Sequence, residues 1–300
     1  MTDLAIFYYT NNLTPPKLLE ATLKSAIDHS VKNNCELIIT SHYPVLKNYE
    51  EVLLGSAKDK DDIDTATGKK YRSKLYEYIV KDLRIDAPSD KIKNYVVGRL
   101  AYRLESIFWQ ILFSCQKCSS DYILFMEDDC FYPSNYIETI RKYLIAHQYD
   151  LTHCSFAVSY LDSEGFFSID NPGFFLSTCA GKKTILEAVL KQKLKLIAES
   201  KKTRFEPILS TQSKLVKDEY KEEIVIEKPL CIDVLLKNQV LDIKHQLNST
   251  LSIPHNIRTR RSKTHPYWGE AQYFTDLINS IQVDEKDSKL WSHGTCLLGY

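Results

Sequence analysis

The sequence predicts an α/β protein with a mostly parallel central sheet flanked by helices. Residues 4–9 form an apolar run typical of a buried strand, and residues 36–40 form a second short strand. Between them, residues 16–33 carry apolar side chains at helical spacing, and Pro15-Pro16 suits the first turn of a helix because proline fixes φ. A strand, a long helix and another strand make a βαβ unit, which favours a parallel sheet.

An acidic motif follows the most apolar stretch of the chain. Residues 121–126 predict a strand buried on both faces, and Glu127, Asp128 and Asp129 come directly after it. Acids at the carboxyl end of such a strand lie where open α/β sheets bind their ligands. Strand alternation points Glu127 and Asp129 to one side and Asp128 to the other. Two carboxylates on one side can hold Mn²⁺ or Mg²⁺, and the alternative is an acidic turn that caps the next helix.

The remaining elements continue this alternation in chain order. Residues 49–90 differ in composition from the alternating segments on either side, because they contain a charge run and a predicted helix at 71–83. They are interpreted as an insertion. Further strands are predicted at residues 94–97, 152–160, 166–168, 173–178 and 222–226. Further helices are predicted at residues 99–116, 133–147, 181–201 and 271–281. We therefore expect one domain over residues 1–300, with an acceptor or lid region at about 200–300.

Composition limits the class of protein. Lys+Arg and Asp+Glu both number 39, so no global field attracts nucleic acid or a membrane, although residues 258–263 form a local basic cluster. No apolar stretch reaches the length of a membrane span, and the first residues lack the features of a signal peptide. Eight scattered cysteines without a disulfide-scaffold pattern favour a cytoplasmic location, and Cys115 and Cys118 form one CxxC without a second pair.

Four motifs occur in an order that resembles a known group of enzymes. They are Ile6-Phe-Tyr-Tyr-Thr-Asn-Asn12, Val97-Gly-Arg99 leading into Trp109-Gln-Ile-Leu112, Tyr122–Asp129 with Phe131-Tyr-Pro133, and His265-Pro-Tyr-Trp-Gly269. With these motifs the chain resembles nucleotide-sugar glycosyltransferases of the GT-A type, within a bacterial and phage group that carries a Glu-Asp-Asp variant of the DxD motif. The resemblance covers roughly residues 4–45, 94–190 and 260–280. It implies a GT-A-like, Rossmann-type sheet and transfer of a sugar from a nucleoside-diphosphate sugar, expected to be a UDP-sugar, to a hydroxyl acceptor.

The resemblance also implies roles for individual residues. The nucleotide would contact the first strand and its loop, that is Tyr8, Tyr9, Thr10 and Asn11, together with Asp128 of the acidic motif. The metal on the diphosphate would be held by Glu127, Asp129 and His265. Direct displacement with inversion needs a base, for which Glu270 ranks first and Asp170 is a further choice, whereas retention needs none.

Basic residues give further candidates from their positions alone. Arg99 and Arg103 lie one turn apart at a helix start, where they oppose the helix dipole, so they are expected either to bind phosphate or to pair with nearby acids. The 258–263 cluster suits clamping of the donor diphosphate or binding of DNA phosphates. The resemblance to the bacterial and phage group implies either a glycan or a hydroxymethylated base in phage DNA as the acceptor.

Other interpretations stay open. Tyr8 and Tyr9 are alternatively core aromatic residues, and His265 is alternatively a loop residue whose ring packs on Trp268. A metal-dependent phosphoesterase or nuclease also uses clustered acids, but it usually has several acidic motifs. A non-catalytic nucleotide-sugar-binding module would keep the fold without the metal.

Overall fold

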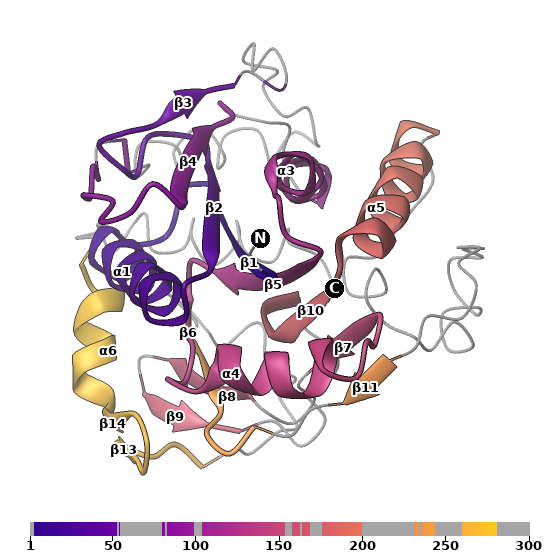
Figure 1. The fold of residues 1–300 in the computed structure, drawn as a ribbon. Coiled ribbons are helices and arrows are strands. Elements are labelled where there is room, and N and C mark those ends of the chain that lie inside the picture. Colours follow the sequence, from indigo (N-terminus) through magenta and orange to yellow (C-terminus); the bar gives the residue numbers. More distant parts are fainter. Residues whose placement is uncertain are drawn as a thin grey trace.

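A mostly parallel sheet of eight strands forms the centre of the computed structural model (Figure 1). The structure describes residues 3–52, 54, 80–81, 83–98, 104–153, 158–162, 164–168, 176–199, 231–233, 236–243 and 260–280. The strand order is β11-β7-β10-β5-β1-β2-β4-β3. In chain order these strands are β1 (Leu4–Thr10), β2 (Glu36–Ser41), β3 (Glu50–Glu51), β4 (Ile92–Val96), β5 (Tyr122–Glu127), β7 (Leu151–His153), β10 (Cys179–Lys182) and β11 (Cys231–Asp233). Within this sheet only β10 runs antiparallel to its neighbours, so the predicted fold class is confirmed.

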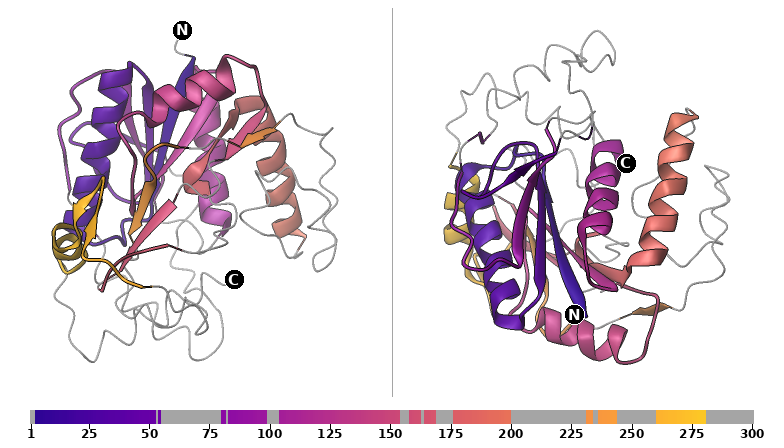
Figure 2. Two further views of the ribbon diagram at one scale, coloured as in Figure 1. Left: turned by 90° about the horizontal axis from the view of Figure 1, so that it is seen from below. Right: turned by 45° about the horizontal axis from the view of Figure 1, so that its top comes forward.

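Helices cover both faces of this sheet, as Figure 2 shows. Helix α1 (Pro16–Asn33) packs on one face, where Leu4, Ile6 and Tyr8 of β1 point. Helices α3 (Leu104–Lys117) and α5 (Lys183–Ala198) pack on the opposite face, which receives the alternate side chains of β1. Strand alternation therefore divides the apolar residues of β1 between two cores.

A smaller sheet begins directly after the acidic motif. It has the order β6-β12-β8-β9, and it comprises β6 (Cys130–Phe131), β12 (Val240–Ile243), β8 (Val158–Asp162) and β9 (Gly165–Phe167). A hairpin of β13 (Thr264–His265) and β14 (Gly269–Glu270) leads into α6 (Ala271–Ile278), whose apolar face packs on this sheet and on α1. The acidic motif thus begins at Glu127, the last residue of β5, and ends directly before β6.

Several predicted elements are confirmed and two are corrected. The helix expected from Pro133 to about residue 147 is present as α4 (Tyr136–Ile140), continued by the π-helical turn η2 (Arg141–Ile145). The strand predicted at 152–160 is wrong as one element, because its two ends belong to β7 and β8 in different sheets. The segment 173–178 ends in the 3₁₀ turn η3 (Leu176–Thr178) rather than in a strand, and three residues are too few to show a period.

Other predictions fall largely outside the described residues. These are the strand at 222–226 and most of the helix at 71–83, of which the described residues 80, 81 and 83 are not helical. Among the described helices, none combines the length and the apolar character that crossing a bilayer requires.

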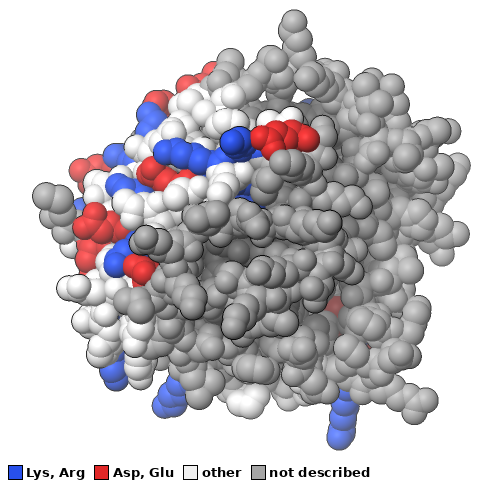
Figure 3. Space-filling model, turned by 90° about the vertical axis from the view of Figure 1, so that its right-hand side faces the viewer, with Lys and Arg blue, Asp and Glu red and all other residues white. Residues whose placement is uncertain are grey.

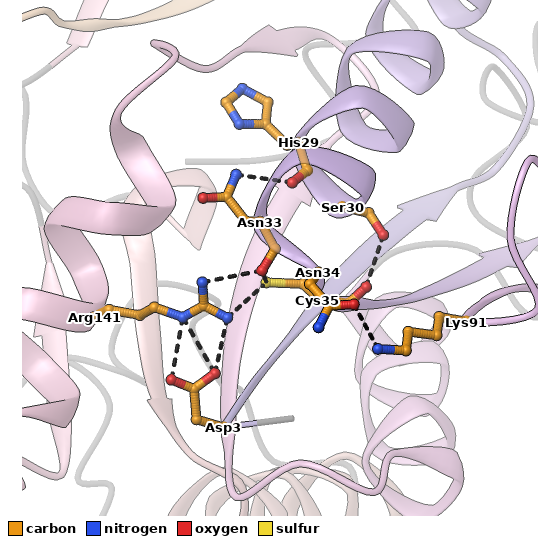
Figure 4. Close-up of polar contacts among 8 residues, drawn as sticks. All are labelled: Asp3, His29, Ser30, Asn33, Asn34, Cys35, Lys91 and Arg141. Atoms are coloured by element: carbon orange, nitrogen blue, oxygen red, sulfur yellow. Dashed lines mark hydrogen bonds and ion pairs between the residues drawn. The ribbon is translucent and has the colours of Figure 1, made fainter. Parts of the chain in front are cut away.

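Arg141 links segments that meet at the amino-terminal ends of the central strands (Figure 4). Its guanidinium donates to the Asp3 carboxylate, at 2.9 Å from Nη2 to Oδ1, and to the Asn33 carbonyl oxygen at 3.1 Å from Nη1. The second contact satisfies one of the last carbonyl groups of α1. Because Asp3 directly precedes β1, this ion pair joins the start of the first strand to the end of the helix that covers it.

Candidate active site

The acidic motif lies where the order of strands reverses. Strand β2 lies beside β1, and β4 lies beside β2, so the first strands follow one another in one direction across the sheet. The next long strand, β5, lies on the other side of β1. Strands β1 and β5 are parallel, and Tyr9 is paired with Glu127 at their carboxyl ends. Ligands of open α/β sheets bind outside the carboxyl ends of the strands at such a reversal. The topology therefore brings the loop after β1 and the acids after β5 to one location.

Each acid of the motif has its own set of contacts. The Tyr9 hydroxyl donates a hydrogen bond to Glu127 Oε1, and the Thr10 hydroxyl donates one to Asp128 Oδ2. The backbone N–H of Glu127 donates to the hydroxyl of Tyr132 at 3.1 Å. The half-buried carboxylates of Glu127 and Asp128 thus take hydrogen bonds from consecutive residues of β1, whose side chains point to opposite faces.

Tyr8 is part of the support of this turn. Its side chain is 1% exposed and its hydroxyl lies 2.9 Å from Thr22 Oγ1. Thr22 in turn lies 3.0 Å from the backbone oxygen of Asp128, which it can reach as a donor. This geometry agrees with Tyr8 as a core aromatic residue that helps to position Asp128 through α1.

Glu127, Asp129 and Cys130 form a group that could hold a metal ion. One ligand atom from each lies within 4.8 Å of the others, and this is the only such group of three or more among the described residues. Burial, and after it the nearby charge of Asp129, raises the pKa of Glu127 to about 8, while the hydrogen bond from Tyr9 opposes the rise. A bound cation would relieve the repulsion between these carboxylates, and the oxygen donors suit a divalent cation. The CxxC residues Cys115 and Cys118 are not part of this group.

The loop after β1 contains one residue that sequence reasoning missed. Asn12 is fully buried and has a φ of 62°, a left-handed conformation that asparagine tolerates better than most residues. Its Oδ1 accepts hydrogen bonds from the backbone N–H groups of His42 and Tyr43, and its Nδ2 donates to the backbone oxygen of Val80 at 3.0 Å. The neighbouring Asn11 is exposed and therefore accessible to a ligand. The only signal in the sequence was the Asn-Asn turn.

His265 lies on β13 with both ring nitrogens engaged. Nδ1 accepts from the backbone N–H groups of Tyr267 and Trp268, at 3.1 and 3.2 Å, and Nε2 lies 3.2 Å from Ser159 Oγ. Burial lowers the pKa of this histidine, and its ring packs against Phe166 at 5.3 Å between centroids. His265 is not one of the residues grouped with Glu127, Asp129 and Cys130. To bind a metal ion held by that group, its Nε2 would first have to break its contact with Ser159.

The basic cluster near this hairpin is held by local partners. Arg261 donates to Asp162 Oδ2 at 2.8 Å, its guanidinium carbon lies 4.3 Å from the centre of the Phe167 ring, and the Asp162 side chain is 1% exposed. Lys263 donates to the backbone oxygen of Glu164 at 2.7 Å, whereas Arg260 is exposed. Clamping a diphosphate with Arg261 would therefore require its ion pair to break.

Of the other sequence-predicted residues, the structure describes only Glu270, which is not part of the group at the acidic turn. Glu270 is exposed and directly precedes α6. Arg99, Arg103, Asp170 and Arg258 lie outside the described residues. On α5, Lys191 pairs with Glu187 at 3.5 Å, and Lys182 at the end of β10 pairs with Asp150 at 2.7 Å. Acidic and basic side chains are interspersed on the described part of the face in Figure 3.

Comparison with known proteins gives a weak similarity in fold. No protein-family model and no curated protein matches the sequence. Among solved structures, S. aureus TarS in complex with UDP-GlcNAc is 8% identical over 98% of this chain and 72% of that one, with a TM-score of 0.41. HddC from Yersinia pseudotuberculosis is 12% identical over 81% of this chain and 93% of that one, with a TM-score of 0.39.

A third similar structure is the bifunctional IspDF from Campylobacter jejuni. It is 8% identical over 79% of this chain, which spans 50% of the length of that protein, with a TM-score of 0.38. All three TM-scores lie below 0.5, so these similarities place the chain in no family. The fold and the acidic turn together define an α/β protein with a candidate metal site at the reversal of its sheet, and the function rests on that geometry.

Proposed function

We propose that the chain is a metal-dependent glycosyltransferase that moves a sugar from a nucleoside-diphosphate sugar to a hydroxyl group. The observation that carries this proposal is the convergence of Glu127 and Asp129 at the carboxyl end of β5, beside the end of β1. A diphosphate bound at a strand reversal lies outside the carboxyl ends of the strands, where a divalent cation on these carboxylates would contact it.

The chemistry follows from the charge that develops on the leaving group. Breaking the bond from sugar to diphosphate leaves negative charge on phosphate oxygens, and a bound Mn²⁺ or Mg²⁺ would neutralise it as a Lewis acid. Glu127 and Asp129 would hold the cation, while the Tyr9 hydroxyl orients Glu127 and the Thr10 hydroxyl orients Asp128. The exposed Asn11 remains available to the nucleotide at the same edge of the sheet.

The acceptor side of the proposal rests on fewer observations. Glu270 is exposed and could accept a proton from an acceptor hydroxyl, and Asp170 remains the second choice for this base. Arg99 and Arg103 are proposed to bind the phosphates, and the donor is proposed to be a UDP-sugar. The acceptor is proposed to be a glycan or a hydroxymethylated DNA base, and Arg260 and Lys263 are exposed cations in the described part of the 258–263 cluster.

Thermal unfolding with UDP and with GDP, each with and without Mn²⁺, tests the proposal. A nucleotide at a hundred times its Kd stabilises the folded state by about 2.7 kcal/mol, which should raise the Tm by about 5 °C in a chain of this size. We expect this rise only when nucleoside diphosphate and Mn²⁺ are both present. No rise with either nucleotide would contradict the proposal.

A metal-dependent phosphoesterase is the second candidate. Asp242 favours it, because this third carboxylate from β12 contributes to the raised pKa of Glu127, and phosphoesterases use larger groups of acids. Stabilisation by Mn²⁺ alone, without a further rise on adding UDP or GDP, would favour this class over the transferase.

A further inference from the structure

Cys130 lies against both carboxylates of the candidate metal group. Its side chain is 2% exposed, and its Sγ lies 3.5 Å from Asp129 Oδ1 and 3.9 Å from Glu127 Oε2. The pairing of β6 with β12 fixes this position, because Cys130 is the first residue of β6. The thiol therefore points toward the carboxylates that the proposed transferase would use for its cation.

The separations between donor atoms match those around a tetrahedral metal ion. With a metal–sulfur bond of about 2.3 Å and a metal–oxygen bond of about 2.0 Å, a tetrahedral angle places sulfur and oxygen about 3.5 Å apart, and a right angle places them about 3.1 Å apart. The observed 3.5 and 3.9 Å correspond to the tetrahedral arrangement or a wider one. Octahedral coordination, which Mg²⁺ demands, would bring these atoms closer together.

A further oxygen donor comes from a distant part of the chain. Asp242 of β12 is paired with Cys130 of β6, and residues directly opposite in an antiparallel pair have side chains on the same face. Asp242 is 6% exposed, so its carboxylate is held within the protein. A third carboxylate, from another strand, therefore lies opposite Cys130 and beside the group of Glu127, Asp129 and Cys130, although it is not one of the three.

We propose that Cys130 binds the cation as a thiolate together with Glu127 and Asp129, with Asp242 as a further oxygen donor, so that the site prefers Zn²⁺ or Co²⁺ to Mg²⁺. The proposal rests on the proposed function to the extent that Glu127 and Asp129 hold a metal there. The thiol proton is released to solvent as the metal–sulfur bond forms. Thiolate is a soft ligand that favours zinc over magnesium, whereas an all-carboxylate site suits Mg²⁺ and Mn²⁺.

Titration of the full chain with Co²⁺ tests this ligand set directly. A thiolate on Co²⁺ gives a sulfur-to-metal charge-transfer band in the near ultraviolet, and any tetrahedral Co²⁺ gives intense d–d bands in the visible. We expect both in the wild type, saturating at about one equivalent because the ligands form a single site. Cys130→Ser should lose the charge-transfer band, and the matched control Cys118→Ser, another buried cysteine, should keep it.

Competition with Mg²⁺ gives a second measurement. Excess Mg²⁺ should leave cobalt bound to the wild type but should displace it from Cys130→Ser. Cadmium NMR of the wild type reports a sulfur ligand without any variant, so the test stands even if Cys130→Ser fails to fold. A charge-transfer band that persists in a folded Cys130→Ser, or a cadmium resonance typical of oxygen ligands alone, would overturn the thiolate while leaving the transferase intact. Absence of any cobalt binding would overturn this ligand set, whereas the transferase is tested separately by the rise in Tm with nucleoside diphosphate and Mn²⁺.

Discussion

Asp129→Asn should separate metal binding from folding, and Asp128→Asn is its matched control. Asp129 belongs to the group with Glu127, whereas Asp128 accepts its hydrogen bond from Thr10. Removing one charged partner from a largely buried site costs about 3 kcal/mol, which corresponds to about a hundredfold in Kd. Part of this loss is offset, because the neutral amide in place of the Asp129 carboxylate no longer repels Glu127, and the pKa of Glu127 falls.

The control keeps its hydrogen bond, because the amide oxygen introduced by Asp128→Asn can still accept from Thr10. That substitution therefore costs about 1 kcal/mol of stability and changes the Kd for Mn²⁺ by about threefold at most. Electron paramagnetic resonance of free Mn²⁺, measured without nucleotide so that a contact of Asp128 with the nucleotide does not enter, gives the Kd of each variant without knowledge of the acceptor. Circular dichroism checks that both variants are folded. Equal Mn²⁺ affinity in wild type and Asp129→Asn would refute the assignment, as would an equally large loss in Asp128→Asn.

Three other substitutions have expected effects that follow from individual contacts. Tyr9→Phe removes the hydrogen bond that lowers the pKa of Glu127, so a proton competes better with Mn²⁺ for this carboxylate. The affinity of the protein for Mn²⁺ at pH 7 should therefore fall about tenfold, and the difference from wild type should shrink as the pH is raised to about 9. Burial lowers the pKa of His29, so the neutral ring is favoured in the folded state. The free energy of unfolding in urea should therefore fall as the pH drops below about 6.5, the pKa of histidine in the unfolded chain, and it should fall less in His29→Gln. Arg261→Ala leaves the Asp162 carboxylate buried without this partner, and differential scanning calorimetry should show a loss of about 3 kcal/mol; an unchanged Tm would mean that the ion pair is not structural.

The elements that the sequence predicted well are those with long local patterns. The apolar run of β1 and the helical spacing of α1 could be predicted because apolar residues recur within a few positions along each segment. The strand ahead of the acids was predicted for the same reason. Glu127 and Asp129 do lie in one group, but Asp129 is in a turn, so the turn and not strand alternation brings them together.

What the sequence could not show depends on contacts between distant segments. Tyr9 and Glu127 are separated by 118 positions, and nothing in either segment states that β5 pairs with β1. Asp242 lies opposite Cys130 only because β12 pairs with β6, a two-residue strand too short for any period. The motif around His265 can be recognised in the sequence. The sequence does not show, however, that its ring accepts hydrogen bonds from the backbone of its own turn.

The support of the acidic turn explains why its three acids are not interchangeable. Glu127 takes its hydrogen bond from Tyr9 on the face of α3, Asp128 is held by Thr10 and by Thr22 of α1, and Asp129 belongs to the group that contains Cys130. Hydrogen bonds from β1 and α1 thus hold Glu127, Asp128 and the turn that follows, so these carboxylates are positioned before a cation arrives. Preorganisation of this kind reduces the ordering needed on binding, and it predicts that substitutions in the support weaken metal binding less than loss of a ligand does.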